Sequence, residues 1–473
     1  MSIALSIVLC LGGLLASPVG AADTAPASAA KAKDGLRLEK LLSQWSIGGS
    51  LSFNWRGVGP REPGFETQIQ HEAFLSDIYF DFHGPVLDDV PFRMEFNFPT
   101  SGRGVPNLYQ MFFEYDRVRR WRFQLGKFLV PFGRYNELYR PDMFMTVTRP
   151  LLYASPDSLD LVVRINSPRP PFSSGYTDIG VRTSYYTPWR RWWLPDELTF
   201  YVVNGLSENN NRLRTFPSPE NLGITPPPAS GVAPDFDHDN NNLADNNNNK
   251  AIGGRIVYWR GSPVPPWPIP EGRHDLKAVL LGLSAMGGQY NLESQLNYRM
   301  IGVDLGFEYQ GAALMAEYMY SFTQLQNPLT AGPGSSTLLN ENSANVPLNF
   351  HTSFEEMHGG FVQAVVPLWR RPLWGKRVSG IVVYNHLQRR GERLSLLQNK
   401  TIDGTFYESI AAHDTSQPRL KTYINKVTIA LNYQLTDFFI GKLEHSYWFM
   451  GRASTFSPTT DIYQSALSIV MAF

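Results

Sequence analysis

The last residues of the chain, Tyr463–Phe473, read YQSALSIVMAF. Leu467 and Ile469 share one face with the terminal phenylalanine, whereas Gln464 and Ser468 lie on the other, which is the period of a β-strand. The apolar face includes the terminal residue itself, although chain ends in soluble domains are usually polar and frayed. We therefore predict the last strand of a closed transmembrane barrel whose apolar face meets lipid. A strand docked in a soluble sandwich is the alternative.

The same alternation recurs along most of the chain after Trp45. It predicts an all-β fold, a transmembrane antiparallel β-barrel of about sixteen strands. In the better-patterned strands the charged residues keep to one parity, which we interpret as the lumen face. The lumen-facing residues predicted in this way include Arg93, Glu95, Arg122, Asp178 and Arg182. The predicted strands are Trp45–Arg56, Phe74–His83, Phe92–Phe98, Leu108–Tyr115, Trp121–Leu125, Thr177–Tyr186, Leu198–Val203, Ala251–Trp259, Lys277–Ser284, Met300–Tyr309, Ala313–Tyr320, His358–Val366, Val378–Asn385, Tyr423–Tyr433, Phe438–His445 and Tyr463–Phe473.

The connections between these strands alternate in length. Most even-to-odd connections are short, such as GPVLDD, DRVRR and QLTD, and tryptophans gather beside several of them. This alternation is typical of outer-membrane barrels, which have long extracellular loops, short periplasmic turns and aromatic belts. The long connections are Gly57–Ala73, Phe128–Tyr176, Asn204–Lys250, Phe322–Met357 and His386–Thr422.

The composition narrows the functional classes. Lys plus Arg (42) equals Asp plus Glu (42), and a nucleic-acid-binding protein would need a basic excess. Aromatic residues make up 13% of the chain, which suits a barrel with aromatic girdles. A large secreted sugar-binding or glycosidase β-domain could share that aromatic content. We predict lipid and small solutes, rather than nucleic acid, as partners.

The first residues predict export. Residues 1–21 form an apolar run that ends in small residues, as in a cleaved signal peptide, and residues 22–44 read as a flexible periplasmic tether. The barrel would then occupy residues 45–473. Cys10, the single cysteine, lies in the predicted signal peptide, so we expect no disulfide, thiolate metal site or cysteine nucleophile in the mature chain.

One long connection contains the acidic stretch DFDHDNNNLADNNNNK. Asp235, Asp237 and Asp239 match the start of a calcium loop, but Asn240 replaces the glycine that such a loop needs and no closing glutamate follows. We therefore predict a solvated loop and neither a metal site nor a cofactor.

The segment LGKFLVPFGRYNELYRPDMF, Leu125–Phe144, resembles the family of phosphate-selective porins O and P. In that family a strand ending in Gly-Lys runs into a Pro-Phe-Gly segment and then the pore loop. A second likeness is the Val-Asn-Gly at Val203–Gly205, which is followed by an Asn/Asp-rich loop, Lys250 and the Gly-Gly-Arg at Gly253–Arg255. The terminal Phe473 is common to outer-membrane barrels in general.

The resemblance implies a sixteen-stranded, often trimeric channel whose third extracellular loop, here residues 128–176, folds inward. We accordingly predict a homotrimeric outer-membrane porin for passive diffusion of small hydrophilic solutes, with a mild preference for anions such as phosphate. Acidic residues nearly balance the bases of this loop, so a dedicated phosphate channel is not predicted. The predicted constriction residues are Lys127, Arg134, Glu137, Arg140, Asp142 and Arg149.

Three other classes of function make different demands on the sequence. A hydrolase would need a nucleophile and an orienting group near a base such as His358, and no serine follows that histidine at a suitable spacing. We therefore predict that the protein is not an enzyme. The barrel could instead be a sheath or scaffold around a partner protein, or an adhesin that binds through its loops.

Overall fold

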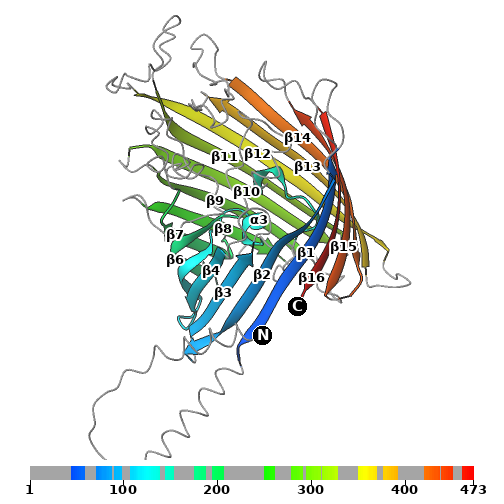
Figure 1. The fold of residues 1–473 in the computed structure, drawn as a ribbon. Helices are drawn as coiled ribbons and strands as arrows, with labels where there is room; N and C mark the ends of the chain where they lie inside the picture. Colours follow the sequence, from blue (N-terminus) through cyan, green and yellow to red (C-terminus); the bar gives the residue numbers. More distant parts are fainter. Residues whose placement is uncertain are drawn as a thin grey trace, which may run out of the picture. The chain divides into compact units, whose positions relative to one another are not determined.

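Sixteen antiparallel strands close into one barrel, in which sequence neighbours pair and β1 also pairs with β16 (Figure 1). The predicted fold class and strand number are confirmed. In its described residues, the loop between β5 and β6 forms two short helices, α3 (Arg134–Glu137) and η1 (Leu151–Tyr153). The strands are β1 (Ser46–Val58), β2 (His71–Leu87), β3 (Val90–Phe98), β4 (Asn107–Tyr115), β5 (Trp121–Leu129), β6 (Thr177–Tyr186), β7 (Glu197–Val203), β8 (Ala251–Arg260), β9 (Ala278–Gln289), β10 (Asn297–Tyr309), β11 (Ala312–Pro328), β12 (Phe350–Trp369), β13 (Arg377–Gly391), β14 (Leu420–Gln434), β15 (Phe439–Met450) and β16 (Asp461–Ala472).

The computed structural model describes residues 44–58, 71–87, 90–98, 107–138, 144–153, 175–187, 194–206, 250–260, 278–290, 295–309, 312–328, 350–369, 377–391, 420–436, 438–450 and 461–473. The predicted signal peptide, almost all of the predicted tether and the Asn/Asp-rich loop lie outside these ranges. Within them, no helix combines the length and apolar character that crossing a bilayer requires.

The side chains of the terminal strand alternate between the two faces of the barrel wall. Leu467 and Ile469 are 45% and 47% exposed on the outer face, whereas Ser468 and Val470 are each 2% exposed on the inner face. The same alternation places large apolar side chains outward on the neighbouring strands, such as Phe53 of β1 and Leu443 of β15. The period-2 pattern of the sequence therefore gave the correct orientation of this strand.

The terminal residue helps to close the barrel. The backbone N–H of Gly49 donates to the carbonyl of Phe473 at 2.9 Å, and the N–H of Phe473 donates to the carbonyl of Gly49 at 3.0 Å. A Cβ at position 49 would lie only 2.7 Å from Cζ of the Phe473 ring, so glycine makes room for that ring. The ring also meets Phe80 of β2 edge-on, at 6.0 Å between centroids.

The barrel wall is uneven in height. A transmembrane strand needs about 9–11 residues, and β7 has 7 residues whereas β12 has 20. The predicted strand His358–Val366 was therefore too short at both ends. The predicted strand Trp121–Leu125 was also too short, because β5 continues to Leu129.

Candidate pore constriction

The chain enters the barrel interior directly after β5. The N–H of Val130 donates to the carbonyl of Tyr176 at 2.9 Å, which ties the two ends of the connecting loop together. Asn136 of α3 reinforces this closure, because its amide nitrogen donates to the Val130 carbonyl at 2.8 Å and its amide oxygen accepts from the Tyr176 N–H at 2.8 Å. Gly133, with φ of 73°, supplies the left-handed turn that starts α3.

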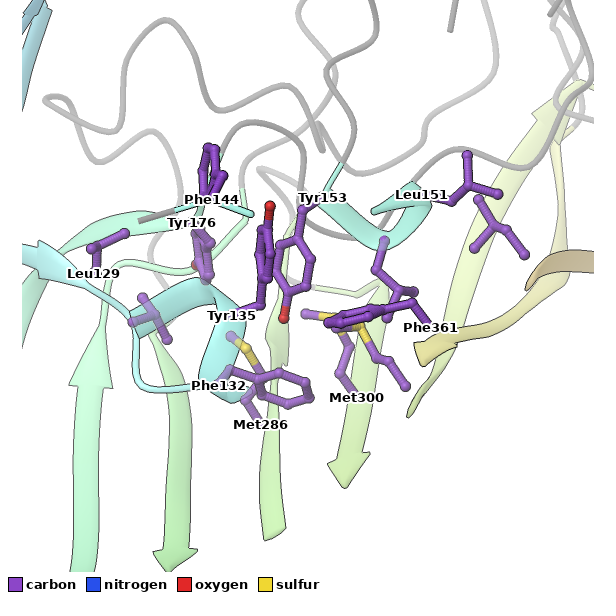
Figure 2. Close-up of a cluster of buried hydrophobic side chains, with 14 of the residues drawn as sticks. Leu129, Phe132, Tyr135, Phe144, Leu151, Tyr153, Tyr176, Met286, Met300 and Phe361 are labelled. Carbon is purple, nitrogen blue, oxygen red and sulfur yellow. The ribbon is translucent and has the colours of Figure 1, made fainter. Parts of the chain in front are cut away.

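The described part of this loop has its own apolar core inside the barrel (Figure 2). The ring of Tyr135 stacks on Phe144 at 5.1 Å and on Tyr153 at 4.8 Å between centroids. It also meets Phe361 of β12 edge-on at 5.6 Å. These contacts hold α3 and η1 as one unit against the inner wall. We call residues 130–138 and 144–153 the inner segment.

Glu317 of β11 fixes the first half of the inner segment to the wall. Its carboxylate accepts from the backbone N–H of Tyr135 at 3.1 Å and from the hydroxyl of Tyr153. Burial and the neighbouring Glu317 carboxylate raise the pKa of Tyr153 well above its usual value, so this phenol stays protonated and remains a donor. The N–H of Gly133 donates to the hydroxyl of Ser284 on β9 at 3.2 Å.

A second carboxylate, Glu444 of β15, fixes the other half of the inner segment. It accepts from the backbone N–H groups of Val147 at 2.7 Å and Thr148 at 2.9 Å, and from the Thr148 hydroxyl. Lys442 of β15 donates to the carbonyl of Phe144 at 2.6 Å. The N–H of Leu151 donates to Oδ1 of Asn385 on β13 at 3.1 Å. The inner segment therefore runs from β5 across the lumen to β13 and β15.

A cluster of charged groups surrounds Glu137 where α3 faces β6 and β8. Its carboxylate lies 3.5 Å from Arg134, 3.5 Å from Arg182 of β6 and 3.6 Å from Arg255 of β8. Arg255 is almost fully buried and also makes a bidentate pair with Asp304, with Nη1 at 2.7 Å from Oδ2 and Nη2 at 2.9 Å from Oδ1. Three guanidinium groups thus share a single carboxylate from the inner segment.

The protonation of Glu137 follows from these neighbours. Burial alone would favour the neutral acid, but Arg255, Arg134 and Arg182 together outweigh it and hold the pKa of Glu137 below its usual value of 4.5. Glu137 is therefore ionised near neutral pH and offsets part of the positive charge of the cluster.

Two wall pairs present their bases to the lumen more than their acids. Arg93 is 35% exposed and donates to Asp81 at 2.9 Å, whereas the Asp81 side chain is 10% exposed. Arg122 is 43% exposed, 3.4 Å from Glu114, which is 19% exposed. At both pairs the guanidinium group is therefore more accessible to solvent than the carboxylate. Glu95, also on the inner face, is fully buried and accepts from the amide of Gln110 at 2.7 Å.

The other predicted site residues are placed as follows. Lys127 lies on β5 rather than in the loop, and its Nζ donates to the carbonyl of Leu108 at 2.8 Å. Asp178 is buried and accepts from the Tyr176 hydroxyl at 2.8 Å. Arg149 lies over the ring of Phe144, at 5.7 Å from its centroid. The predicted residues Arg140 and Asp142 lie outside the described ranges.

Several residues that form or hold the candidate constriction were not predicted from the sequence. Arg255 was missed because both faces of its strand read as small or apolar, although a charged residue in such a strand is itself a signal of a buried partner. Glu317 and Asn136 gave no local signal, because their partners are backbone groups of a distant segment or of the loop base.

His358 is part of the barrel wall. It lies within β12, on the outer face, and its Nδ1 is 3.0 Å from the hydroxyl of Tyr318. Its ring is 6.0 Å from that of His386, centroid to centroid.

The sequence matches no protein-family profile. It also matches no curated protein. Solved structures of similar fold include the outer membrane channel DcaP of Acinetobacter baumannii, with 11% identity, coverage of 91% of this chain and 97% of that chain, and a TM-score of 0.45. The anion-selective porin from Comamonas acidovorans has 12% identity, coverage of 91% and 99%, and a TM-score of 0.41. A loop-deletion mutant of OmpT, an outer membrane protein of Vibrio cholerae, has 10% identity, coverage of 91% and 99%, and a TM-score of 0.44. At these identities and TM-scores the matches assign neither a family nor an activity.

Proposed function

We propose that this protein is an outer-membrane channel through which small hydrophilic solutes diffuse passively, with a mild preference for anions. The observation that carries the proposal is the inner segment, which crosses the lumen and is held to the far wall by Glu317 and Glu444. A segment fixed in this way narrows a barrel without needing to move. Its arginines, with those of the facing wall, then act on solutes where the passage is smallest.

The anion preference rests on which charges meet solvent. Arg93 and Arg122 are the more exposed members of their ion pairs, and Arg134 and Arg182 share Glu137 with Arg255. In a low-dielectric neck, exposed charges of one sign focus the field and enrich counter-ions. Because carboxylates lie beside most of these bases, the preference is mild.

Replacing Arg122 and Arg134 by glutamine is expected to shift the reversal potential toward cations. The physical reason is the loss of two positive charges from the lumen. The shift should be larger in dilute salt, because screening shortens from about 30 Å at 0.01 M to about 3 Å at 1 M. Single-channel recording in planar bilayers under a salt gradient measures both the conductance and the reversal potential.

Arg260 provides the matched control for that pair. It is similarly exposed and pairs with Asp196 at 2.5 Å, but it lies at the end of β8 on the outward parity of Ile252 and Ile256, not on the lumen face. Arg260→Gln should leave the reversal potential almost unchanged. Equal shifts from the control and the test pair would mean that the inner segment does not set selectivity.

Acidification is expected to strengthen the anion preference through Glu137. Because its pKa is depressed, the carboxylate stays ionised above 4.5, and its charge is lost as the pH falls through the lower folded-state value. Protonation leaves Arg134, Arg182 and Arg255 less compensated. The anion permeability ratio should rise below about pH 4.5, and Glu137→Gln should show the raised ratio already at pH 7. A variant that follows the wild-type pH curve would contradict this role.

The alternatives make different demands. A sheath around a partner protein needs a wide lumen, whereas the inner segment crosses it, and an adhesin needs no segment inside the barrel. Extraction under mild conditions followed by native mass spectrometry separates the channel from both alternatives, since a sheath or adhesin would bring its partner. The same measurement tests the homotrimer, which we retain as part of this proposal.

A further inference from the structure

The outward side chains of the barrel differ in polarity from one part of its circumference to another. On β8–β10 six outward side chains are large and aliphatic, namely Ile252 next to the start of β8 and, along the middle of the strands, Ile256, Leu281, Leu283, Ile301 and Val303. On β11–β16 the outward side chains at similar positions along the strands include tyrosines, histidines and an asparagine. Groups of this kind are costly in hydrocarbon unless hydrogen-bonded. We call the second set the polar belt: Tyr318, His358, Tyr384, His386, Asn425, His445, Tyr463 and Ser465.

Side chains of the polar belt are hydrogen-bonded to one another across β13 and β14. Nδ1 of His386 lies 2.7 Å from Oδ1 of Asn425, and the Tyr384 hydroxyl donates to the same oxygen at 3.0 Å. The carbonyl oxygen can only accept, so His386 donates from Nδ1. Tyr384 is 48% exposed, and the apolar Val382 below it is 51% exposed on the same face. The outer surface of β13 therefore changes from apolar to polar midway along the strand.

The polar belt continues onto β15 and β16. Nδ1 of His445 lies 3.0 Å from the hydroxyl of Ser465. The ring of Tyr463 stacks on that of His445 at 6.4 Å between centroids. On the same faces, the apolar Leu443 and Leu467 lie nearer the short connections. On β13–β16 polar side chains thus follow apolar ones toward the long connections, and beyond this boundary β15 carries Tyr447 and the 39% exposed Phe449.

The wall above this boundary is tall. β12 has 20 residues, about twice what a strand needs to cross a bilayer. Above His386, β13 continues to Gly391 and carries the exposed Arg390 on its outer face. By contrast β7, on another side of the barrel, has 7 residues and ends at Val203. A bulky headgroup in the outer leaflet would therefore find a protein wall to lie against at β11–β16.

We propose that the polar belt binds the headgroup of a phosphorylated glycolipid in the outer leaflet. Tyrosine hydroxyls, imidazoles and an amide match the hydroxyl-rich surface of a sugar, and tyrosine rings suit the boundary between apolar and wet surroundings. Arg390, above, lies across from Glu356 of β12 on the same face and supplies the cation of this surface for a phosphate. The inference needs the membrane setting of the proposed function but is independent of conduction.

The test is glycolipid binding by the purified full-length protein in detergent, measured by native mass spectrometry. Rough-type lipopolysaccharide is the probe, and phosphatidylglycerol is the comparison lipid. His386→Leu with Asn425→Leu should weaken lipopolysaccharide binding about tenfold, the effect of losing one to two hydrogen bonds. Tyr384→Phe keeps the ring and removes one hydroxyl, so it should show a smaller loss in the same direction.

Ile252→Leu with Ile301→Leu, on the apolar part of the outer face, is the matched control and should bind like the wild type. All variants should keep the wild-type single-channel conductance, which separates this test from that of the channel itself. Unchanged lipopolysaccharide binding in both belt variants would overturn the proposal, as would equal binding of phosphatidylglycerol. Conversion of an oligomer to monomers by the double belt variant would overturn it too, because the belt would then be a contact between copies of this chain.

Discussion

Replacing Leu467 and Ile469 together by arginine is expected to abolish assembly of the barrel. Both side chains point outward from β16, and their cross-strand partners on β1 are Trp55 and Phe53. An arginine facing lipid near the midplane costs about 2–4 kcal/mol, so two of them offset much of a typical stability of about 5–15 kcal/mol. They also lie in the strand that closes the barrel. The variant should accumulate in the periplasm, and its gel mobility should not change on heating.

A double replacement by arginine at the rim of the barrel provides the control. Leu435 and Phe438 lie in the short connection between β14 and β15 and are 45% and 59% exposed. The cost of an arginine falls to about 0–1 kcal/mol near the interface, so Leu435→Arg with Phe438→Arg should assemble. Normal assembly of the β16 variant would mean that this face does not meet lipid.

Removing both carboxylates that hold the inner segment is expected to raise single-channel conductance several-fold. Glu317→Ala leaves the Tyr135 N–H and the Tyr153 hydroxyl without their acceptor, and Glu444→Ala does the same for two backbone N–H groups. Each buried donor left unsatisfied costs about 1–3 kcal/mol, so release of the segment into the lumen becomes favourable. The anion preference should decrease in the same recordings.

Glu355→Ala is the matched control for these anchors. Glu355 pairs with Arg389 at 2.7 Å on the inner face of β12 and β13, and its partner belongs to the wall rather than to the inner segment. This variant should keep the wild-type conductance. Glutamine at 317 and 444 retains an acceptor oxygen and should restore part of the wild-type conductance. If the double alanine variant conducts like the wild type, the inner segment is not the narrowest point.

The sequence predicted the strands because alternation is a local property. The pattern in Tyr463–Phe473 located β16 and predicted its orientation. On β3 and β6, the charged residues at alternate positions identified the face that points into the barrel. Strand ends were predicted poorly at β12. Near Glu355 and Glu356 both faces are polar, so the pattern disappears although the hydrogen-bonded ladder to β11 and β13 continues.

The contacts of the candidate pore constriction were harder to predict from the sequence than the fold was. The Pro-Phe-Gly segment and nearby arginines pointed to the loop, but not to what holds it. Glu137 was predicted as one acid among several, whereas its three arginine neighbours come from α3, β6 and β8. Contacts of this kind depend on how the barrel closes, and no period or spacing in a single sequence encodes them.

The inner segment also sets an order of events in biogenesis. Tyr135 precedes its acceptor Glu317 by 182 residues, and Val147 precedes Glu444 by 297 residues. Neither contact can form before the strand that carries its carboxylate has been added. The narrowing of the lumen is therefore completed only when β15 is in place, one strand before β16 pairs with β1 and closes the barrel.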